Sequence, residues 1–431
     1  SLSSTINSPL MLLHFNSILL HHDSNDCPRL IMKLLIVVSS LDLTQPFSAT
    51  PAFWQLMKAL YEIGVEVVAT PYQGPAIESL WWRAEPNPAK LYGDAFKTAR
   101  DSLRAVMPNT QVQMDTTTDD ETLDSESSMD KFTRKMAQTL IAPLWRKHLD
   151  TILTKQDDID AVIFLTVPLN HLVGVPQYIQ DKHDVPVFYF DGDVPASLPN
   201  MKGFASGFRI YQGADASEYT AFISNSLGGE EHLLNLGAKS AHTVWYGADP
   251  MLYAPLENIS KDYDAFFFGH GREYRAEWID AMLIEPSQKI DSAKFAVRGK
   301  NLGDLGRVEQ LPYLSFSKLR EYVSRSKLNL VITRGAHASV YGSSSMRPFE
   351  LAAMRSAMVA NPYLGLELWF EPEKEVIIVN SAEEAIDRYR YLLAHDTERE
   401  AMATAAYNRF LKQHTFQHRA RELKAIIEAY I

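Results

Sequence analysis

Cysteine is nearly absent from this chain of 431 residues, which contains only Cys27. A single cysteine cannot form a disulfide within one chain, and this fits a reducing compartment such as the cytoplasm. No run of about 18 or more apolar residues occurs, so the sequence predicts no transmembrane helix. An excess of basic residues is also missing, since the formal net charge is -11. No long basic stripe offsets that charge, which argues against a nucleic-acid partner.

The signatures of covalent and metal-dependent catalysis are missing too. The sequence has no GxSxG, no HExxH and no CxxC motif, and Cys27 lies in a segment that precedes the first predicted strand. Asp191-Gly192-Asp193 has the letters of a D-x-D motif, but the surrounding two-domain pattern does not need a metal. Residues 115–130 carry seven acidic residues in sixteen positions, which favours a mobile surface loop over a metal-binding loop. We expect no bound metal and no cofactor.

The composition is that of a globular protein, with 46% hydrophobic and 22% charged residues. The segment "MKLLIVVSS" from Met32 is a natural first strand, so residues 1–31 are interpreted as an N-terminal extension. From there apolar runs alternate with amphipathic ones. For example, "KLLIVVSS" precedes "TPAFWQLMKALYEIG", for which Thr50 is the predicted N-cap, and a long helix is expected around 87–106.

Strands separated by helices predict parallel sheets covered by helices on both faces. Two such series occur, one before and one after "YGADPMLYAPLENISKDYD", and the C-terminal residues are helical. The predicted fold class is therefore α/β, with two doubly wound Rossmann-like domains whose parallel sheets face each other across a cleft. The expected units are the extension at 1–31, a first domain at 32–255, a second at 262–405 and C-terminal helices at 406–431.

Candidate site residues were sought where strands end, because open α/β sheets bind ligands beyond the carboxyl ends of their strands. "FFFGHGREYR" places two glycines and two arginines after a strand: Gly269, Gly271, Arg272 and Arg275. Glycines allow backbone amides to approach a ligand closely, and arginines bind phosphate oxygens in a fork. A turn with solvated arginines is the alternative interpretation.

Further cations follow the next predicted strands. Arg298 and Lys300 flank Gly299, and Arg334 follows "LNLVIT". Such cations can neutralise a diphosphate leaving group, on which negative charge develops during glycosyl transfer. Arg347 and Glu350 then lie at the predicted start of a helix, where Glu350 serves either the helix dipole or the hydroxyls of a ribose.

In the first half, His171 follows one strand and Asp193 follows the next, so both are expected to face the second domain. Either can serve as a general base. The alternatives are a loop histidine with its hydrogen bonds satisfied, and a turn residue beside Gly192. The aromatic residues of "ESLWWRAEPNPAKLY" either stack on sugar rings or pack on the core.

The C-terminal half resembles GT-B glycosyltransferases of the group 1 type, and is most similar to the CgeB-like spore-maturation branch. The resemblance covers roughly Asp262 to Leu423, whereas Met32 to Asp249 is similar only in architecture. The segment "AHTVWYGADPMLYAP" is similar to the G-x-D-x-x-x-F hinge of that group. The branch pattern of Arg-x-x-Glu, small residues, acidic loop and strand matches Arg347, Glu350, Ala352, Ala353, Glu367, Phe370 and Glu375.

The resemblance implies a hexosyltransferase-type enzyme that moves a sugar from a nucleotide-diphosphate sugar, most simply a UDP- or GDP-sugar, to a glycan or another hydroxyl-bearing acceptor. It implies a donor in the second domain, an acceptor in the first, no metal, and retention of configuration. Glu350 matches the second Glu of the family's E-x7-E motif, which contacts the donor ribose. The first Glu position of that motif falls on Ser343, so this sequence departs from the family pattern there.

Three rival functions remain open at this stage, one of which is a partner subunit that activates another transferase. A nucleotide-sugar epimerase uses the same two-domain architecture and needs no acceptor. A non-enzymatic protein that binds a sugar nucleotide or a glycan would explain the missing first Glu, because fold does not fix function.

Overall fold

The computed structural model describes residues 31–44, 49–90, 128–199, 210–269, 271, 275–312 and 318–431. The helix predicted around 87–106 and the acidic loop predicted at 115–130 lie largely outside the described residues, and so does Arg272. The last three positions of that loop are helical, since α3 begins at Ser128. The predicted domain boundaries stay a prediction.

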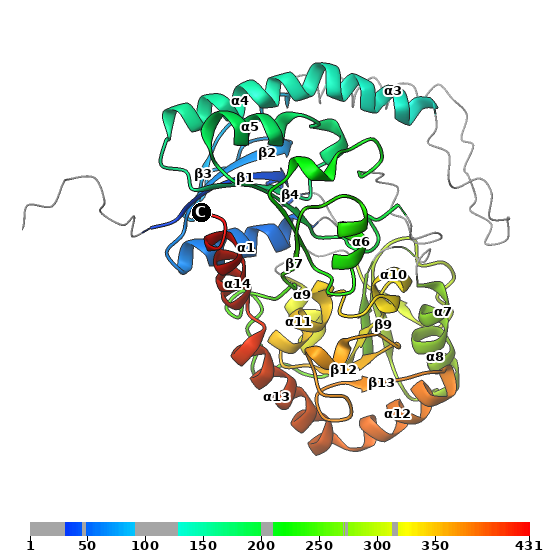
Figure 1. Cartoon of the computed structure of the whole chain (residues 1–431). Coiled ribbons are helices and arrows are strands. Elements are labelled where there is room, and N and C mark those ends of the chain that lie inside the picture. Colours follow the sequence, from blue (N-terminus) through cyan, green and yellow to red (C-terminus); the bar gives the residue numbers. More distant parts are fainter. Residues whose placement is uncertain are drawn as a thin grey trace, which may run out of the picture. The chain divides into compact units, whose positions relative to one another are not determined.

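The first sheet has seven strands in the order β3-β2-β1-β4-β5-β6-β7, and every neighbouring pair is parallel. We call this sheet with its helices the first lobe (Figure 1). Its elements are β1 (Lys33–Ser40), α1 (Thr50–Glu62), β2 (Glu66–Gln73), β3 (Arg83–Ala84), α3 (Ser128–Met136), η1 (Ala137–Ile141), α4 (Ala142–Lys155), β4 (Ala161–Leu165), η2 (Leu169–His171), α5 (Val175–His183), β5 (Val187–Asp191), η3 (Ala216–Glu218), β6 (Ala221–Ser224), α6 (Glu230–Asn235) and β7 (Ala241–Thr243).

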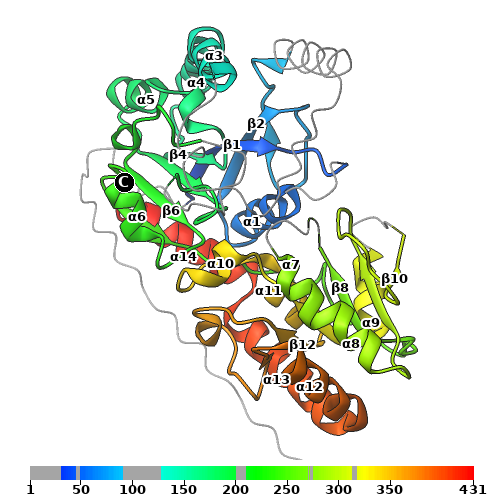
Figure 2. The ribbon, with the colours of Figure 1, turned by 90° about the vertical axis from the view of Figure 1, so that its right-hand side faces the viewer.

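The second sheet has six strands in the order β10-β9-β8-β11-β12-β13, again with every pair parallel. This sheet and the helices around it form the second lobe (Figure 2). Its elements are β8 (Tyr263–Phe268), α7 (Ala276–Ile279), η4 (Asp280–Ile284), α8 (Glu285–Lys289), β9 (Phe295–Arg298), β10 (Glu309–Gln310), α9 (Leu319–Ser324), β11 (Ser326–Val331), α10 (Gly335–Ser339), α11 (Met346–Ala353), β12 (Ala357–Ala360), η6 (Leu366–Leu368), β13 (Ile377–Ile378), α12 (Ala382–Ala394) and α13 (Asp396–Gln413). The last helix of the chain is α14 (Phe416–Glu428).

Strand β1 shows why the apolar runs fold as predicted. Leu34 and Ile36 belong to the hydrophobic core on one face of the first sheet, whereas Leu35 and Val37 belong to the core on the other. Successive side chains of a strand point to opposite faces, so a strand buried on both sides must be apolar throughout. The same holds for β8, where Ala265 and Phe266 pack into different cores of the second lobe.

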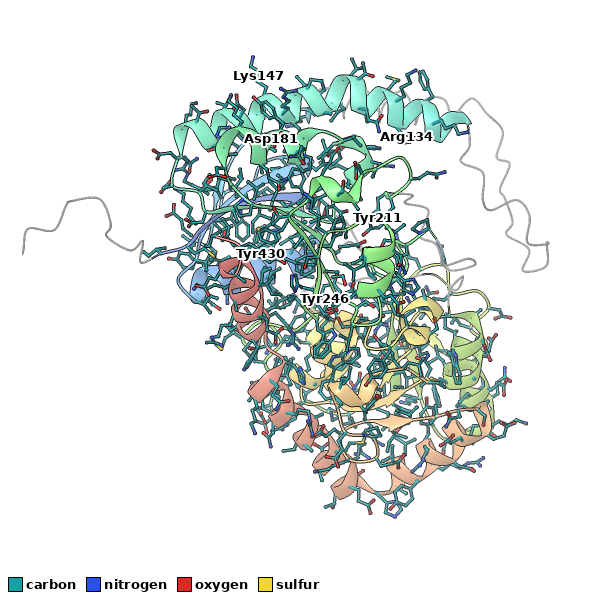
Figure 3. The ribbon with its side chains drawn as sticks, in the orientation of Figure 1. Arg134, Lys147, Asp181, Tyr211, Tyr246 and Tyr430 are labelled. Atoms are coloured by element: carbon teal, nitrogen blue, oxygen red, sulfur yellow. The ribbon has the colours of Figure 1, made fainter. Side chains whose placement is uncertain are left out.

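The predicted N-cap of α1 was wrong by one residue. Ala52 and Phe53 both donate their backbone N–H to the carbonyl of Ala49, so the helical hydrogen bonds start at Ala49 and Thr50 is already helical. Pro51 lies in the first turn, where its missing N–H breaks no intrahelical hydrogen bond. Elements α3, η1 and α4 follow one another without interruption and form one long helical stretch past Arg134 and Lys147 (Figure 3).

The last helix returns to the first lobe. Phe416, Ala420, Leu423 and Ile427 of α14 are buried in the same core as residues of β1 and α1, and Figure 1 shows α14 beside α1. The chain therefore passes from the first lobe to the second and back. No helix among the described residues has the length and apolar character that crossing a membrane requires.

Candidate functional site

Arginine side chains gather where the strands of the second sheet end. They surround a pocket of about 150 Å³ that is lined by residues following β8 and β11 and by the first turns of α11. The lining residues are Arg275, Thr333, Arg334, His337, Ser345, Met346, Arg347 and Glu350. We call this the arginine pocket. Three predicted donor-binding arginines and the predicted Glu350 thus share one pocket.

Two of these arginines are fixed by one backbone carbonyl. Arg275 and Arg347 each donate from Nη1 to the carbonyl oxygen of Ile332 over 3.2 Å. The guanidinium of Arg347 also lies 5.0 Å and 4.7 Å from the ring centroids of Phe267 and Phe268, which is within reach of a cation–π attraction. The two positive charges are therefore held side by side.

The same two arginines retain unused hydrogen-bonding capacity. The Nε atoms of Arg275 and Arg347 are buried and have no partner among the described residues, and neither side chain makes an ion pair with those residues. Burial lowers the pKa of Arg347 to about 10, and burial together with Arg347 and Arg334 lowers that of Arg275. Arginine keeps its proton in proteins, so both guanidinium groups are cations at neutral pH. The charge of Glu350 partly offsets that of Arg347, and Asp193 pairs with Arg334. Among the described residues around the pocket, three arginines therefore face two carboxylates, and this desolvated excess of positive charge favours an anion.

Glu350 lies three residues after Arg347 on α11 and is only 5% exposed. Its Oε1 accepts a hydrogen bond of 2.8 Å from the hydroxyl of Tyr253. Burial raises the pKa of Glu350, whereas Tyr253, Arg347 and Arg298 lower it. The carboxylate is thus held at the pocket wall with acceptor capacity left over, since an ionised carboxylate accepts several hydrogen bonds.

Asp193 reaches the arginine pocket from the first lobe. Arg334 donates from Nη2 to Asp193 Oδ1, and His337 Nε2 lies 3.7 Å from the same oxygen. Burial raises the pKa of Asp193, and Arg334 opposes that rise. Burial and the neighbouring arginines lower the pKa of His337, which is 3% exposed and therefore neutral. Of the two predicted catalytic residues, Asp193 is the one that contacts the pocket.

His171 has a different environment. It lies on η2, and its Nδ1 is 2.8 Å from the hydroxyl of Tyr72. Burial, with a smaller contribution from Arg134, lowers the pKa of His171 to about 4. It is not among the residues that line the arginine pocket. His171 therefore contacts Tyr72, whereas Asp193 contacts two residues that line the arginine pocket.

The glycines predicted to approach a ligand bring two loops together. Gly269 and Gly271 donate backbone hydrogen bonds of 3.0 Å to the carbonyls of Arg298 and Lys300. A Cβ added at Gly299 would lie 1.9 Å from the carbonyl oxygen of Gly269, so only glycine fits there. These glycines join the loops after β8 and β9. Whether they also approach a ligand stays a prediction.

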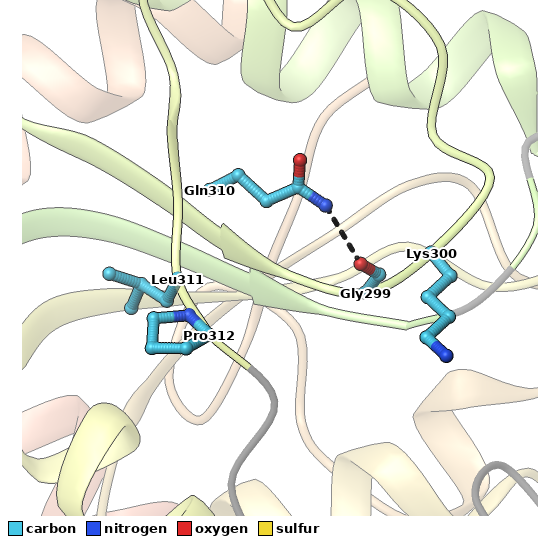
Figure 4. A pocket seen from close by; sticks show the side chains of 5 residues that line it. All are labelled: Gly299, Lys300, Gln310, Leu311 and Pro312. Carbon is cyan, nitrogen blue, oxygen red and sulfur yellow. Dashed lines mark hydrogen bonds between the residues drawn. The ribbon is translucent and has the colours of Figure 1, made fainter.

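Lys300 lines a second pocket, of about 320 Å³, beyond β9 and β10. Its other lining residues are Gly299, Gln310, Leu311 and Pro312, and Gln310 Nε2 donates to the Gly299 carbonyl over 3.0 Å (Figure 4). Arg298 lies outside both linings and is 6% exposed, within reach of the charge on Glu350. The two predicted cations beside Gly299 thus face different surroundings.

The sequence analysis did not identify Tyr253 or Thr333 as site residues. A signal for Tyr253 exists, because it occupies the Phe position of the G-x-D-x-x-x-F hinge and adds the hydroxyl that binds Glu350. Thr333 lines the arginine pocket, and its buried Oγ1 has no partner in the described part of the chain. Nothing in the local sequence distinguishes Thr333 from other loop threonines.

Comparisons with known proteins agree with this architecture. Residues 272–425 match a family model described as glycosyl transferase-like, which covers little more than a third of the chain. The matched region coincides with the stretch for which the resemblance to group 1 enzymes was predicted. Among curated proteins no sequence matches.

Solved structures similar to this chain span nearly its whole length. Sucrose-phosphate synthase from Thermosynechococcus elongatus superposes with a TM-score of 0.63 at 13% identity, covering 92% of this chain and 98% of its own. TarM gives 0.63 at 9% identity, with coverages of 92% and 98%. Anabaena Alr3699/HepE, solved in complex with UDP and glucose, gives 0.57 at 11% identity, with coverages of 92% and 99%.

At such identities the likeness shows the fold alone. The predicted fold class is confirmed in that two Rossmann-like domains, each built on a parallel sheet, match the structures of GT-B glycosyltransferases. The chain therefore has the GT-B glycosyltransferase fold, and its segment 272–425 carries the sequence pattern of the glycosyl transferase-like family.

Proposed function

We propose that this protein is a glycosyltransferase that moves a sugar from a nucleotide-diphosphate sugar to a hydroxyl-bearing acceptor. The observation that carries the proposal is the arginine pocket. It presents Arg275, Arg334 and Arg347 at the carboxyl ends of parallel strands, beside the N-terminus of α11. Guanidinium groups and helix N-termini both attract phosphate oxygens. A diphosphate would supply negative charge to neutralise these arginines.

The donor would extend from the arginine pocket across the ends of the second sheet. Its diphosphate would bind Arg275 and Arg347, and its ribose hydroxyls would donate to Glu350. The pocket at Gly299, Lys300 and Gln310–Pro312 is the proposed site for the base, because it lies next to the loop that follows β8 and has an apolar wall. Alr3699/HepE was solved with UDP and glucose, which supports a nucleotide sugar for this fold.

In this reaction the main catalytic contribution of the protein would be to stabilise the leaving diphosphate. Negative charge develops there as the glycosidic bond to the donor breaks, and fixed cations in a desolvated pocket stabilise it without reorganisation. We infer a reaction without a metal, with retention of configuration and with the leaving phosphate taking the acceptor proton. If the enzyme inverts configuration, Asp193 is favoured over His171 as the general base, since Asp193 adjoins the pocket.

The finer assignments are part of the same proposal. The donor would be a UDP- or GDP-hexose and the acceptor a glycan or another hydroxyl compound. The closest branch would be the CgeB-like one, acting in the cytoplasm. The resemblance of Arg347, Glu350 and the segment after them is what supports that branch.

The test is a binding screen followed by a turnover assay. UDP, GDP, ADP, dTDP and CMP, and then their sugars, are added without metal, and the melting temperature and the heat of binding are measured. A ligand that binds only the folded state raises the melting temperature by mass action. One nucleotide diphosphate that stands out supports the proposal and identifies the base. No response to any nucleotide would overturn it.

One observation favours a second candidate, a sugar-nucleotide binding protein without turnover. The predicted position of the first Glu, Ser343, was wrong by one residue, because seven residues between the two glutamates place it eight residues before Glu350, at Gly342. Gly342 has φ 62°. Its carbonyl accepts hydrogen bonds from Leu227 N over 3.2 Å and from Trp245 Nε1 over 2.9 Å. The position thus joins the lobes and cannot hold a sugar through a carboxylate. Tight donor binding with no sugar transfer or hydrolysis would establish this candidate.

A further inference from the structure

One arginine of the pocket already has a carboxylate partner. Arg334 follows β11 and Asp193 follows β5, so their ion pair joins the two lobes. Each side chain is 30% exposed. Arg275 and Arg347, in contrast, make no ion pair with the described residues. Within the described part of the chain, Arg334 is the one of the three arginines that forms an ion pair with a carboxylate, whereas Arg347 feels the charge of Glu350 without an ion pair.

The backbone on both sides of this ion pair is well fixed. Asp193 N donates to Asp191 Oδ1 over 2.9 Å, and the Gly192 carbonyl accepts from Tyr246 OH over 2.7 Å. On the other side, Thr333 N donates to Asn361 Oδ1 over 2.8 Å, and the Arg334 carbonyl caps the first turn of α10. Because the backbones are held, a change of partner at Arg334 requires only side-chain rotation.

An anion in the arginine pocket would compete with Asp193 for Arg334. The guanidinium has five N–H donors and binds a phosphate in the same forked geometry as a carboxylate. Once Arg334 turns to the phosphate, the remaining neighbour of Asp193 Oδ1 is neutral His337, 3.7 Å away. The Asp193 carboxylate would then lack its charged partner and could accept a hydrogen bond from a hydroxyl.

We propose that Arg334 is a positioning residue that couples donor binding to the acceptor site. In the absence of a donor it holds Asp193. The donor diphosphate draws Arg334 away, and the freed carboxylate accepts a hydrogen bond from the acceptor hydroxyl. The acceptor therefore binds productively only after the donor. This inference rests on the proposed function, because it requires an anionic donor in the arginine pocket.

A double-mutant cycle on nucleotide affinity tests the coupling. UDP, or the nucleoside diphosphate that the screen selects, is titrated by calorimetry into the wild type, Asp193→Asn, Arg334→Gln and the double variant. Asp193→Asn removes the competitor for Arg334 and should tighten binding about fivefold, which is the scale of a partly exposed ion pair. In the Arg334→Gln background the same substitution should give a clearly smaller gain.

Electrostatic repulsion alone predicts the opposite pattern. If Asp193 merely repels the phosphate, its removal helps as much or more once Arg334 is gone, and that result would overturn the coupling. Asp181→Asn is the matched control for loss of one negative charge, since Asp181 lies exposed on α5 and binds Gln177 Nε2 at 2.7 Å. It should leave the affinity unchanged.

The outcomes separate the two proposals. A wild type that binds no nucleoside diphosphate removes both, whereas a wild type that binds well and gains nothing from Asp193→Asn removes only the coupling. Thermal unfolding checks that each variant folds, and Asp193→Ser replaces Asp193→Asn if the latter does not. An equal gain with and without Arg334 contradicts the proposal with either variant.

Discussion

The charged side chains buried at the strand ends of the two lobes differ in sign and in how fully their hydrogen-bonding atoms are satisfied. In the first lobe, Asp191 is fully buried and accepts hydrogen bonds from Ser197 Oγ, Tyr211 OH and Asp193 N. In the second lobe, buried Nε atoms of Arg275 and Arg347 have no partner among the described residues.

This difference distinguishes a residue with a structural role from residues that can bind a ligand. A buried carboxylate that accepts three hydrogen bonds is satisfied within the protein, so Asp191 stabilises its loop and requires no ligand. Buried guanidinium groups with unused donors cost free energy until an anion arrives. Under the proposed function, the second lobe would bind the anionic donor and the first lobe, through Asp193, the hydroxyl-bearing acceptor.

The largest effect is expected from Arg347→Gln. The substitution removes a charge-assisted contact to the diphosphate and should weaken nucleotide binding about 100-fold, while stability stays equal or rises because a buried cation without an ion pair is lost. Calorimetry and thermal unfolding measure the two quantities. Arg390→Gln, at an exposed arginine on α12, is the control and should change neither. If the Arg347 variant binds the nucleotide as tightly as the wild type does, the proposed difference in role between the two lobes is wrong.

The next effect concerns the segment through which the chain returns to the first lobe. His414 is 3% exposed, and its Nδ1 accepts from Arg419 Nη2 over 2.7 Å while its Nε2 faces the Trp369 carbonyl at 3.1 Å. Burial and Arg419 lower the pKa of His414 to about 3. The neutral form is thus favoured by folding, so this stabilisation is complete above the unfolded pKa of about 6.5 and is lost as the pH falls.

At pH 5 this loss should amount to about 2 kcal/mol of unfolding free energy, because pH 5 lies roughly 1.5 units below the unfolded pKa of histidine. Urea unfolding of the wild type and of His414→Gln between pH 8 and pH 5 measures it. The variant starts less stable but should lose correspondingly less on acidification. Parallel curves for the two proteins would show that His414 does not titrate on unfolding in this range.

A smaller effect is expected at Glu350. Glu350→Ala should weaken nucleotide-sugar binding at least tenfold, about 1.4 kcal/mol, and leave the fold intact. If the carboxylate binds the ribose, the wild type prefers UDP over 2′,3′-dideoxy-UDP and the variant does not. Tyr253→Phe removes only one hydrogen-bond donor to Glu350 and should have a smaller effect. Unchanged affinity in a folded Glu350 variant would contradict the ribose role.

The smallest effect should come from His171→Asn. His171 contacts Tyr72 and lies outside the lining of the arginine pocket, so donor affinity should stay within about twofold. Equilibrium titration with the same nucleotide measures it. A tenfold loss would mean that the first lobe also holds the donor, and the distinction between the two lobes would fail.

Much of the fold could be predicted because its strands are buried on both faces. "KLLIVVSS" and "DYDAFFF" contain the unbroken apolar runs "LLIVV" and "AFFF", and this pattern favours a parallel sheet covered by helices. Local rules failed only in detail, as at Thr50, where one residue decides whether a side chain precedes the helix or belongs to it.

For the candidate site, the sequence by itself determined the residue types and the edge where they gather. All parallel strands of a sheet end at a common edge. In the second lobe this edge is where Arg275 and Arg334 follow strands and where Arg347 lies in the first turn of a helix. Which side chains meet was decided by the tertiary structure. The partners of Arg334 and Glu350 lie 141 and 97 residues away, at Asp193 and Tyr253. Periodicity records which face of an element is buried, but partners from different elements are brought together only by packing.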